Sequence, residues 1–259
     1  MRRCMDAALA ANPEGAQLKR VQLEQVRLEY TEEYIQMRRK LAAGDYAAAI
    51  QACDAANAKY SEIKKMDRFH SLVGSPFNPT SDAAQSLSAW RKLIVNRYEN
   101  TGGNGKPNDL VAKLPEMWKF STDPERKAFA DGWTAANYDD SGWKELSTAL
   151  VWTYQWPGDY HDQAVYRTRV KIDDKWTGRK IELDAPEVYG EFTLFVNGSK
   201  VVHRDYKAPW WLNDYHKPWV ADLTEFIKPG EVNQITLVVN QPISWGGVSQ
   251  TMFLWSPKE

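Results

Sequence analysis

The sequence predicts an α+β, multidomain protein in which an N-terminal helical hairpin or bundle precedes an antiparallel β-sandwich. Its 259 residues exceed one average domain of about 100 to 200 residues. Eleven of the twelve tryptophans lie at or after Trp118, and only Trp90 precedes them. The first hundred residues are instead rich in strong helix formers. We therefore expect a helical segment at 1–99, a Gly- and Asn-rich linker at 100–113 and a sandwich at 114–259.

The helical segment contains three predicted helices. Apolar residues recur near helical spacing from Gln17 to Leu41, which predicts a long amphipathic helix. Gly44 suits a left-handed C-terminal cap, and Asp45 suits the N-cap of the next helix, Tyr46 to about Tyr60. The two helices form a hairpin. A shorter helix is expected from about Ser81 to Tyr98.

The linker prediction rests on the run Asn100 to Asn108, whose Gly and Asn residues neither helix nor strand tolerates. After it, short alternating runs are separated by turn signals, which is typical of an antiparallel sandwich. The expected strands are Trp118–Ser121, Ala164–Ile172, Lys180–Asp184, Glu191–Val196, Ser199–His203, Gln234–Asn240 and Val248–Trp255.

Two of these strands give detailed predictions. From Ala164 to Ile172 polar and apolar residues alternate, so we expect one face of this strand to be buried and the other to face water. Asn197-Gly198 joins two such runs, and this pair favours the type I′ turn of a β-hairpin because both residues tolerate positive φ.

Charge and hydropathy exclude several partners. Lys and Arg number 33 against 34 Asp and Glu, and no stretch concentrates basic residues as nucleic-acid binding requires. No apolar run approaches the roughly 18 residues of a membrane helix. The start of the chain is too polar after its third residue for a signal peptide, so none is expected here. Cys4 and Cys53 are too few for a disulfide framework.

Several local motifs in the second half resemble a known family. These are Trp133 to Trp143 (WTAANYDDSGW), Val165-Tyr-Arg-Thr-Arg, Phe195-Val-Asn-Gly and the segment that starts at Asp222-Leu-Thr-Glu-Phe. In order and spacing they resemble the sugar-binding domain of glycoside hydrolase family 2 enzymes, a galactose-binding-like jelly roll. The resemblance covers roughly Leu114 to Glu259.

The resemblance implies a domain that packs beside a catalytic barrel and need not bind sugar itself. Nothing in the sequence resembles that barrel. The helical part is similar to the end of uncharacterised bacterial glycosidase-like proteins, which would make the chain the tail of a longer enzyme. The family resemblance also implies a bacterial parent protein that is exported to the periplasm or the extracellular space.

Aromatic residues in three predicted loops are the candidate binding residues, because sugar rings stack on Trp and Tyr while their hydroxyls pair with nearby polar groups. The carbohydrate-binding candidates are Trp152, Tyr154, Trp156, Tyr160, His161, Trp210, Trp211, Asp214, Tyr215, His216 and Trp245. Any one of these tryptophans can equally pack at an end of the sandwich. Trp118, Trp133, Trp143 and Trp255 adjoin strand patterns and are assigned to structure.

No cofactor is expected, and calcium is the only metal ion for which the sequence offers candidate ligands. Asp139 and Asp140 are candidate calcium ligands because calcium takes oxygen ligands, although such a run more often forms a turn. The four histidines lack zinc-site spacing.

The predicted function is a non-catalytic carbohydrate-binding module of a polysaccharide-degrading protein, with a polysaccharide or oligosaccharide as ligand and a catalytic domain of the parent protein as a further partner. Two alternatives stay open. One is a structural sandwich that buttresses a missing catalytic domain. The other is a glycoside hydrolase, which needs two carboxyl groups about 5 to 10 Å apart across a cleft.

Overall fold

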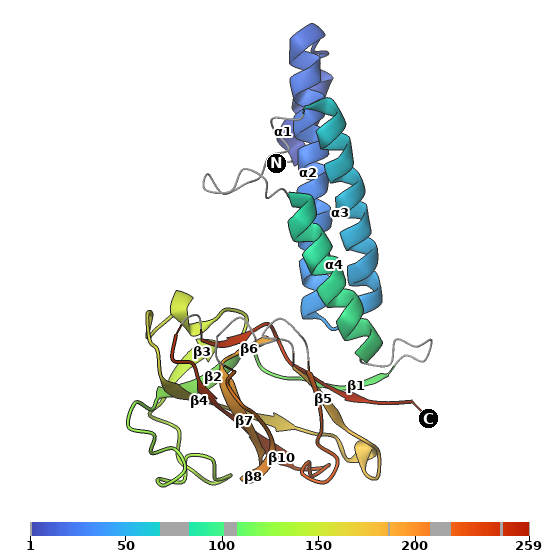
Figure 1. Ribbon diagram of the computed structural model, residues 1–259. Coiled ribbons are helices and arrows are strands. Elements are labelled where there is room, and N and C mark those ends of the chain that lie inside the picture. Colours follow the sequence, from blue (N-terminus) through green and yellow to red (C-terminus); the bar gives the residue numbers. More distant parts are fainter. Residues whose placement is uncertain are drawn as a thin grey trace. The chain divides into compact units, whose positions relative to one another are not determined.

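The computed structural model describes residues 2–67, 83–100, 108–185, 187–207, 219–243 and 246–258, without the side chains of 83–86 and 100. The chain divides into two compact units, residues 1–98 and 99–259 (Figure 1). The first unit is helical and the second consists of antiparallel β-sheets. The predicted α+β class is confirmed.

The described residues of the helical part form four helices: α1 (Arg2–Ala10), α2 (Gly15–Ala42), α3 (Tyr46–Met66) and α4 (Ala83–Asn100), whose last two residues extend past the boundary of the unit. Gly44 has φ +78°, and the Asp45 carboxylate accepts the N–H of Ala48 at 3.2 Å. Both caps predicted between α2 and α3 are therefore present. Helix α1 was not expected from the sequence, and none of its residues is buried.

The helical unit has a core of its own. Met37 of α2, Ala49 and Ala56 of α3 and Ile94 of α4 are completely buried, and Cys53 of α3 donates its thiol hydrogen to the Leu87 carbonyl of α4. The three helices are therefore packed together by small and aliphatic side chains. Among the residues described, no helix combines the length and the apolar character of a bilayer span.

The part of the second unit that the structure describes contains three sheets. The six-stranded sheet has the order β3-β2-β4-β10-β7-β8, the four-stranded sheet has the order β1-β12-β5-β9, and β11 pairs with β6. The strands are β1 (Asp109–Lys113), β2 (Met117–Thr122), β3 (Lys144–Ser147), β4 (Gln163–Lys171), β5 (Glu182–Ala185), β6 (Glu187–Tyr189), β7 (Glu191–Val196), β8 (Ser199–Arg204), β9 (Trp219–Asp222), β10 (Val232–Asn240), β11 (Gly247–Ser249) and β12 (Phe253–Ser256).

The core of this unit lies between the two larger sheets. It joins Tyr166 of β4 and Leu237 of β10 from the six-stranded sheet with Leu183 of β5 and Leu254 of β12 from the four-stranded sheet. The hairpin of β7 and β8 turns at Asn197 (φ +52°) and Gly198 (φ +85°), as the Asn-Gly pair predicts.

Three expectations about strands need revision. Strand β1 lies inside the stretch expected to be a linker. The single strand expected at Val248–Trp255 is divided into β11 and β12, because Gln250 adopts φ +102° and interrupts the extended backbone. On β4, the face expected to meet water is largely covered, since Val165 and Arg167 have no exposed surface.

Candidate functional site

The first candidate loop, residues 152–161, is anchored by Trp152. This side chain has no exposed surface, its Nε1–H donates to the Tyr160 carbonyl at 2.9 Å, and its ring stacks on that of Tyr166. Gly246 lies against the ring so closely that a Cβ there would be 1.9 Å from the Trp152 side chain. The prediction that Trp152 binds carbohydrate is therefore wrong: its ring belongs to the core.

Tyr160 and His161 close the same loop. The Tyr160 hydroxyl donates to the Gln163 carbonyl at 2.6 Å, and burial, aided by the charge of Asp162, raises the pKa of Tyr160 to about 12. This hydroxyl is committed to the backbone. His161 is exposed, and its Nε2 lies 2.8 Å from a carboxylate oxygen of Asp159.

Tyr154 and Trp156 are the two rings that this anchored loop exposes. Their exposed fractions are 65% and 46%. The Lys144 ammonium lies 3.6 Å from the ring centroid of Trp156, and the edge contact with Phe120 fixes the orientation of the indole. Among the tryptophans that the structure describes, Trp156 alone is exposed.

Polar groups adjoin Tyr154. Burial raises the pKa of Tyr189, and the Glu187 carboxylate and Tyr154 add to this effect, so Tyr154 lies near this pair. The Tyr189 hydroxyl donates to the Glu187 carboxylate at 3.1 Å. Glu187 and Tyr189 are buried on β6, so the exposed polar groups of the loop itself are Asp159 and His161. With these groups the loop combines exposed aromatic rings with hydrogen-bonding groups, which is the combination that sugar recognition uses.

The other two candidate loops lie outside the described residues. This applies to Trp210, Trp211, Asp214, Tyr215, His216 and Trp245, which stay predictions.

The candidate calcium ligands have other partners. Asp140 is buried, and its two carboxylate oxygens accept from Arg167 Nε at 2.7 Å and from Arg169 Nη1 at 2.8 Å. Asp139 accepts the backbone N–H of Ser141 at 3.0 Å, as in a turn. The prediction of calcium at Asp140 is wrong, because both oxygens of this carboxylate already accept hydrogen bonds from guanidinium groups, which also balance its charge. No group of His, Cys, Asp and Glu side chains that could hold a metal ion occurs within the described ranges.

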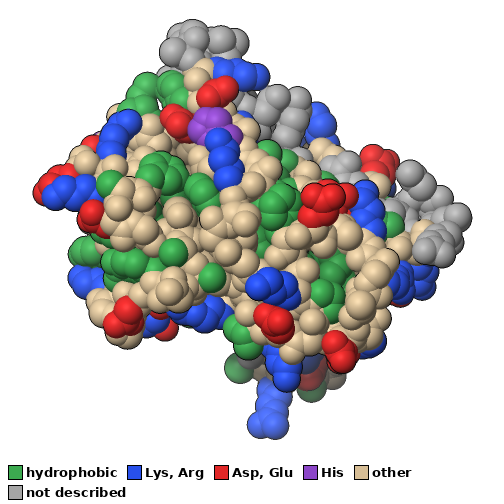
Figure 2. Space-filling view, turned by 90° about the horizontal axis from the view of Figure 1, so that it is seen from below, with side chains coloured by type: hydrophobic (Ala, Val, Ile, Leu, Met, Phe, Trp, Pro, Cys, Tyr) green, Lys and Arg blue, Asp and Glu red, His purple; other side chains and the backbone are tan. Residues whose placement is uncertain are grey.

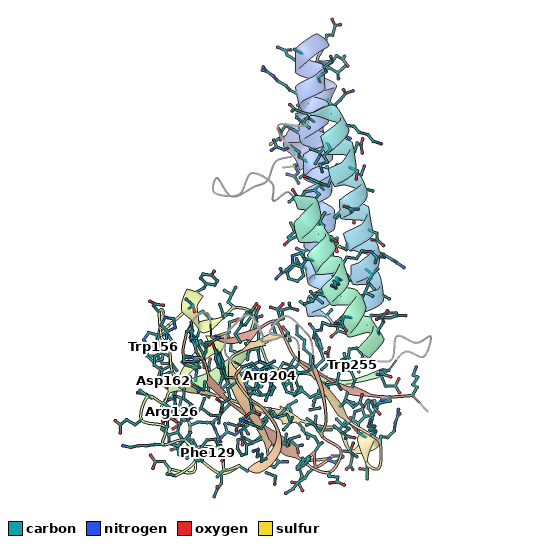
Figure 3. The ribbon with its side chains drawn as sticks, viewed as in Figure 1. Arg126, Phe129, Trp156, Asp162, Arg204 and Trp255 are labelled. Atoms are coloured by element: carbon teal, nitrogen blue, oxygen red, sulfur yellow. The ribbon has the colours of Figure 1, made fainter. Side chains whose placement is uncertain are left out.

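A further site was missed by sequence reasoning. A hollow of about 250 Å³, here called the Phe129 groove, lies on the face of β10, β7 and β8 that points away from the core. Its main lining residues are Phe129, Glu191, Thr193, Phe195, His203 and Asn240. The alternation along β7 and β10 could have shown that these strand residues share a face, but Phe129 comes from an irregular segment without such a signal. Figure 3 labels Phe129, Arg126 and Asp162 on the same side of the sandwich as Trp156.

Comparison with known proteins gives a distant likeness. No protein-family model matches the chain. The crystal structure of Ruminococcus gnavus beta-glucuronidase is similar to 57% of this chain with 18% identity and a TM-score of 0.49. The same enzyme in complex with D-glucuronic acid is similar over the same share with 19% identity and a TM-score of 0.49. In both cases this chain covers 29% of the enzyme's length.

Proposed function

We propose that the chain is a non-catalytic carbohydrate-binding module of a polysaccharide-degrading protein, which binds glycan through the exposed rings of Tyr154 and Trp156. The observation that carries this proposal is the contrast within one loop. Trp152 and Tyr160 fasten the loop to the core, whereas Tyr154 and Trp156 point their rings into solvent. Rigid exposed rings lose little conformational freedom when a sugar stacks on them.

The chemistry of this function is binding alone. A shallow aromatic surface desolvates little area and makes few directed contacts, so the affinity is expected to be weak. Lys144 occupies one face of the Trp156 ring, and a sugar stacks on the other face or displaces this exposed, flexible side chain. The resemblance to family 2 sugar-binding domains favours a parent enzyme, bacterial and exported, whose catalytic domain is a further partner.

Affinity-gel electrophoresis tests the proposal. The purified chain is run through gels that contain soluble plant or algal polysaccharides, beside Trp156→Ala and Tyr154→Ala. We expect one glycan to retard the wild-type chain and the two variants to lose most of that retardation. Leu110→Ala, which truncates a 42% exposed side chain on β1, is the matched control and should be retarded like the wild type.

A buttressing sandwich is the second candidate. Trp118 and Trp152 are completely buried, and Trp133 contacts Trp143 with ring centroids 5.1 Å apart, so most described tryptophans of this unit serve packing. If no polysaccharide retards the wild-type chain, the structural role becomes the better account.

A further inference from the structure

The Phe129 groove is built from three cross-strand rows on the outer face of the six-stranded sheet. The first row pairs Asn240 of β10 with Glu191 of β7, and the second pairs Val238 with Thr193. Thr193 is in turn opposite His203 of β8. Directly opposed side chains on one face lie within contact distance, so the sheet itself places these groups together.

A β-bulge in the β7–β8 pair adds the third row. Lys200 is opposite Phe195, and His203 is opposite Thr193, with a shift of register between them. Without the extra residue, side chains three positions apart on a strand would point to opposite faces. The bulge therefore lets Lys200 and His203 share the face that forms the groove.

Phe129 supplies an apolar wall that is half open to solvent. Its exposed fraction is 53%, and its ring lies 5.8 Å, centroid to centroid, from that of Phe195. Phe195 and Val238 are buried beside it. An exposed ring above a buried apolar floor offers a surface on which the C–H face of a sugar can stack.

The position of Phe129 is fixed by the preceding turn. Asp123 is buried, and its carboxylate accepts the N–H groups of Lys127 at 2.7 Å and Ala128 at 2.9 Å. It also accepts from the Gln163 side chain of β4 at 2.7 Å. Phe129 follows directly after these anchored residues, so the groove exists before any ligand binds.

A chain of loosely paired polar groups runs along the rim. Arg126 donates to Asp162 at 3.3 Å and to Asn240 at 3.5 Å, and Asn240 donates to Glu191 at 3.3 Å. Glu191 is 3.8 Å from Nε2 of His203. These distances are long for charge-assisted hydrogen bonds, which are typically about 2.7 to 2.9 Å, so these groups can exchange partners with the hydroxyls of a ligand.

His203 is oriented by two neighbours. Its Nε2 lies 2.9 Å from a carboxylate oxygen of Asp205, and its Nδ1 lies 2.8 Å from the Thr193 hydroxyl. Because a carboxylate only accepts, the neutral ring carries its proton on Nε2. These two contacts hold the imidazole in one orientation at the wall of the groove.

We propose that the Phe129 groove binds one neutral sugar ring of a glycan, which stacks on Phe129 and exchanges hydrogen bonds with Glu191, Asn240 and Lys200. Arg126 is opposed by Asp162, and His203 by two carboxylates. The face drawn in Figure 2 likewise intersperses basic with acidic side chains and shows a histidine beside them. A surface of mixed sign favours a neutral ligand over a strongly charged one.

The size of the hollow limits the ligand. Its volume of about 250 Å³ lies below the roughly 300 to 1,000 Å³ of sites that enclose drug-sized molecules. One ring fills it, and the glycan on either side stays on the surface. This inference rests on the proposed carbohydrate-binding function but uses residues separate from Tyr154 and Trp156.

The experiment compares binding at the groove and at the loop in the full chain. Affinity electrophoresis in galactomannan and in xyloglucan, both neutral, is run for wild type, Phe129→Ala, Phe129→Tyr, Glu191→Gln and Trp156→Ala, with Leu110→Ala as the control. We expect Phe129→Ala to weaken binding to at least one of these glycans about tenfold. Phe129→Tyr, which keeps the ring, should bind like the wild type, and Glu191→Gln should weaken binding without altering the near-UV circular dichroism spectrum.

The outcomes separate this inference from the proposed function. If Phe129→Ala and Glu191→Gln bind like the wild type while Trp156→Ala does not, the groove is no sugar site, although the proposed function stands. If neither glycan retards the wild-type chain, the groove proposal is overturned, and the remaining polysaccharides of the panel decide the proposed function. Weakening by Phe129→Ala with retention in Phe129→Tyr supports the groove, whatever Trp156→Ala does.

Discussion

Asp140 shows how one residue organises the outer face of the six-stranded sheet. Burial alone would raise its pKa, but hydrogen bonds from Arg169 and Arg167 outweigh burial and hold the pKa below its ordinary value. Arg167 has no exposed surface and also donates to the carbonyls of Trp133 and Ala135. Removing one member of such a buried pair leaves the other charge without compensation.

We therefore predict that Asp140→Asn lowers the free energy of unfolding at neutral pH by about 3 to 5 kcal/mol. Because the pKa of Asp140 is lower in the folded than in the unfolded chain, its stabilising contribution is complete above the unfolded value of about 3.9. It is lost as the pH falls through the folded pKa. Urea unfolding at a series of pH values measures the difference between variant and wild type.

That difference should be constant at neutral and mildly acidic pH and should shrink below about pH 4. Asp131→Asn is the control, since this exposed carboxylate belongs to the same segment but to no buried pair. A difference between Asp140→Asn and wild type that does not change with pH would contradict the assigned role of the carboxylate.

The helices and turns that the sequence predicted correctly are the ones marked by a local signal. Gly44 and Asp45 marked the end of α2 and the start of α3, and Asn197-Gly198 marked the β7–β8 turn. These residues act through backbone conformations that neighbours along the chain define. Such signals can be read without knowledge of the tertiary structure.

Elements that depend on distant partners were missed. Strand β1 pairs with β12 at the other end of the chain, so the residues around 109 carry no local sequence signal that predicts a strand. The alternation in β4 gave the correct division of side chains between two faces. It could not reveal that residues 123–143 place Ala128 and Trp133 against Val165 on the outer one.

Strand β1 should contribute measurably to the stability of the sandwich. Leu110 is opposite Trp255 and Lys113 is opposite Phe253, while Arg179 donates to the Asp109 carboxylate at 3.2 Å. A fragment of residues 114–259, the boundary suggested by the sequence, should be less stable than residues 99–259. The loss should reach about 2 kcal/mol or more, at about 1 kcal/mol for each missing ladder hydrogen bond.

Urea unfolding followed by tryptophan fluorescence measures this loss. The fragment 108–259 is the matched control, because it lacks the preceding residues but keeps β1. Equal stability of 114–259 and 108–259 would mean that β1 contributes nothing to the sandwich.

Across the chain, composition placed most tryptophans in the second unit, but it did not show which of them are exposed to solvent. The candidate loop illustrates the limit: Trp152 and Trp156 are four residues apart, yet one is completely buried and the other is 46% exposed. Trp152 can be buried because Gly246, distant in sequence, leaves the space for its ring. The Phe129 groove was missed because it combines an irregular segment with residues of four strands.

The two units have separate cores, and we predict that they unfold in separate steps. Far-UV circular dichroism at the helical minimum follows mainly the helical unit, whereas tryptophan fluorescence follows the sandwich, which holds eleven of the twelve tryptophans. The helical signal should be lost at lower urea concentration, because a smaller unit buries a smaller fraction of its surface. The two transitions should therefore not coincide.

Two substitutions make this prediction specific. Ile94→Ala, at a completely buried position of α4, should shift only the helical transition, and Asp140→Asn should shift only the fluorescence transition. If either substitution moves both curves together, the units unfold as one cooperative structure. Separate shifts would instead show that each sequence pattern, the helical repeat of the first hundred residues and the strand alternation of the remainder, specifies a stable fold by itself.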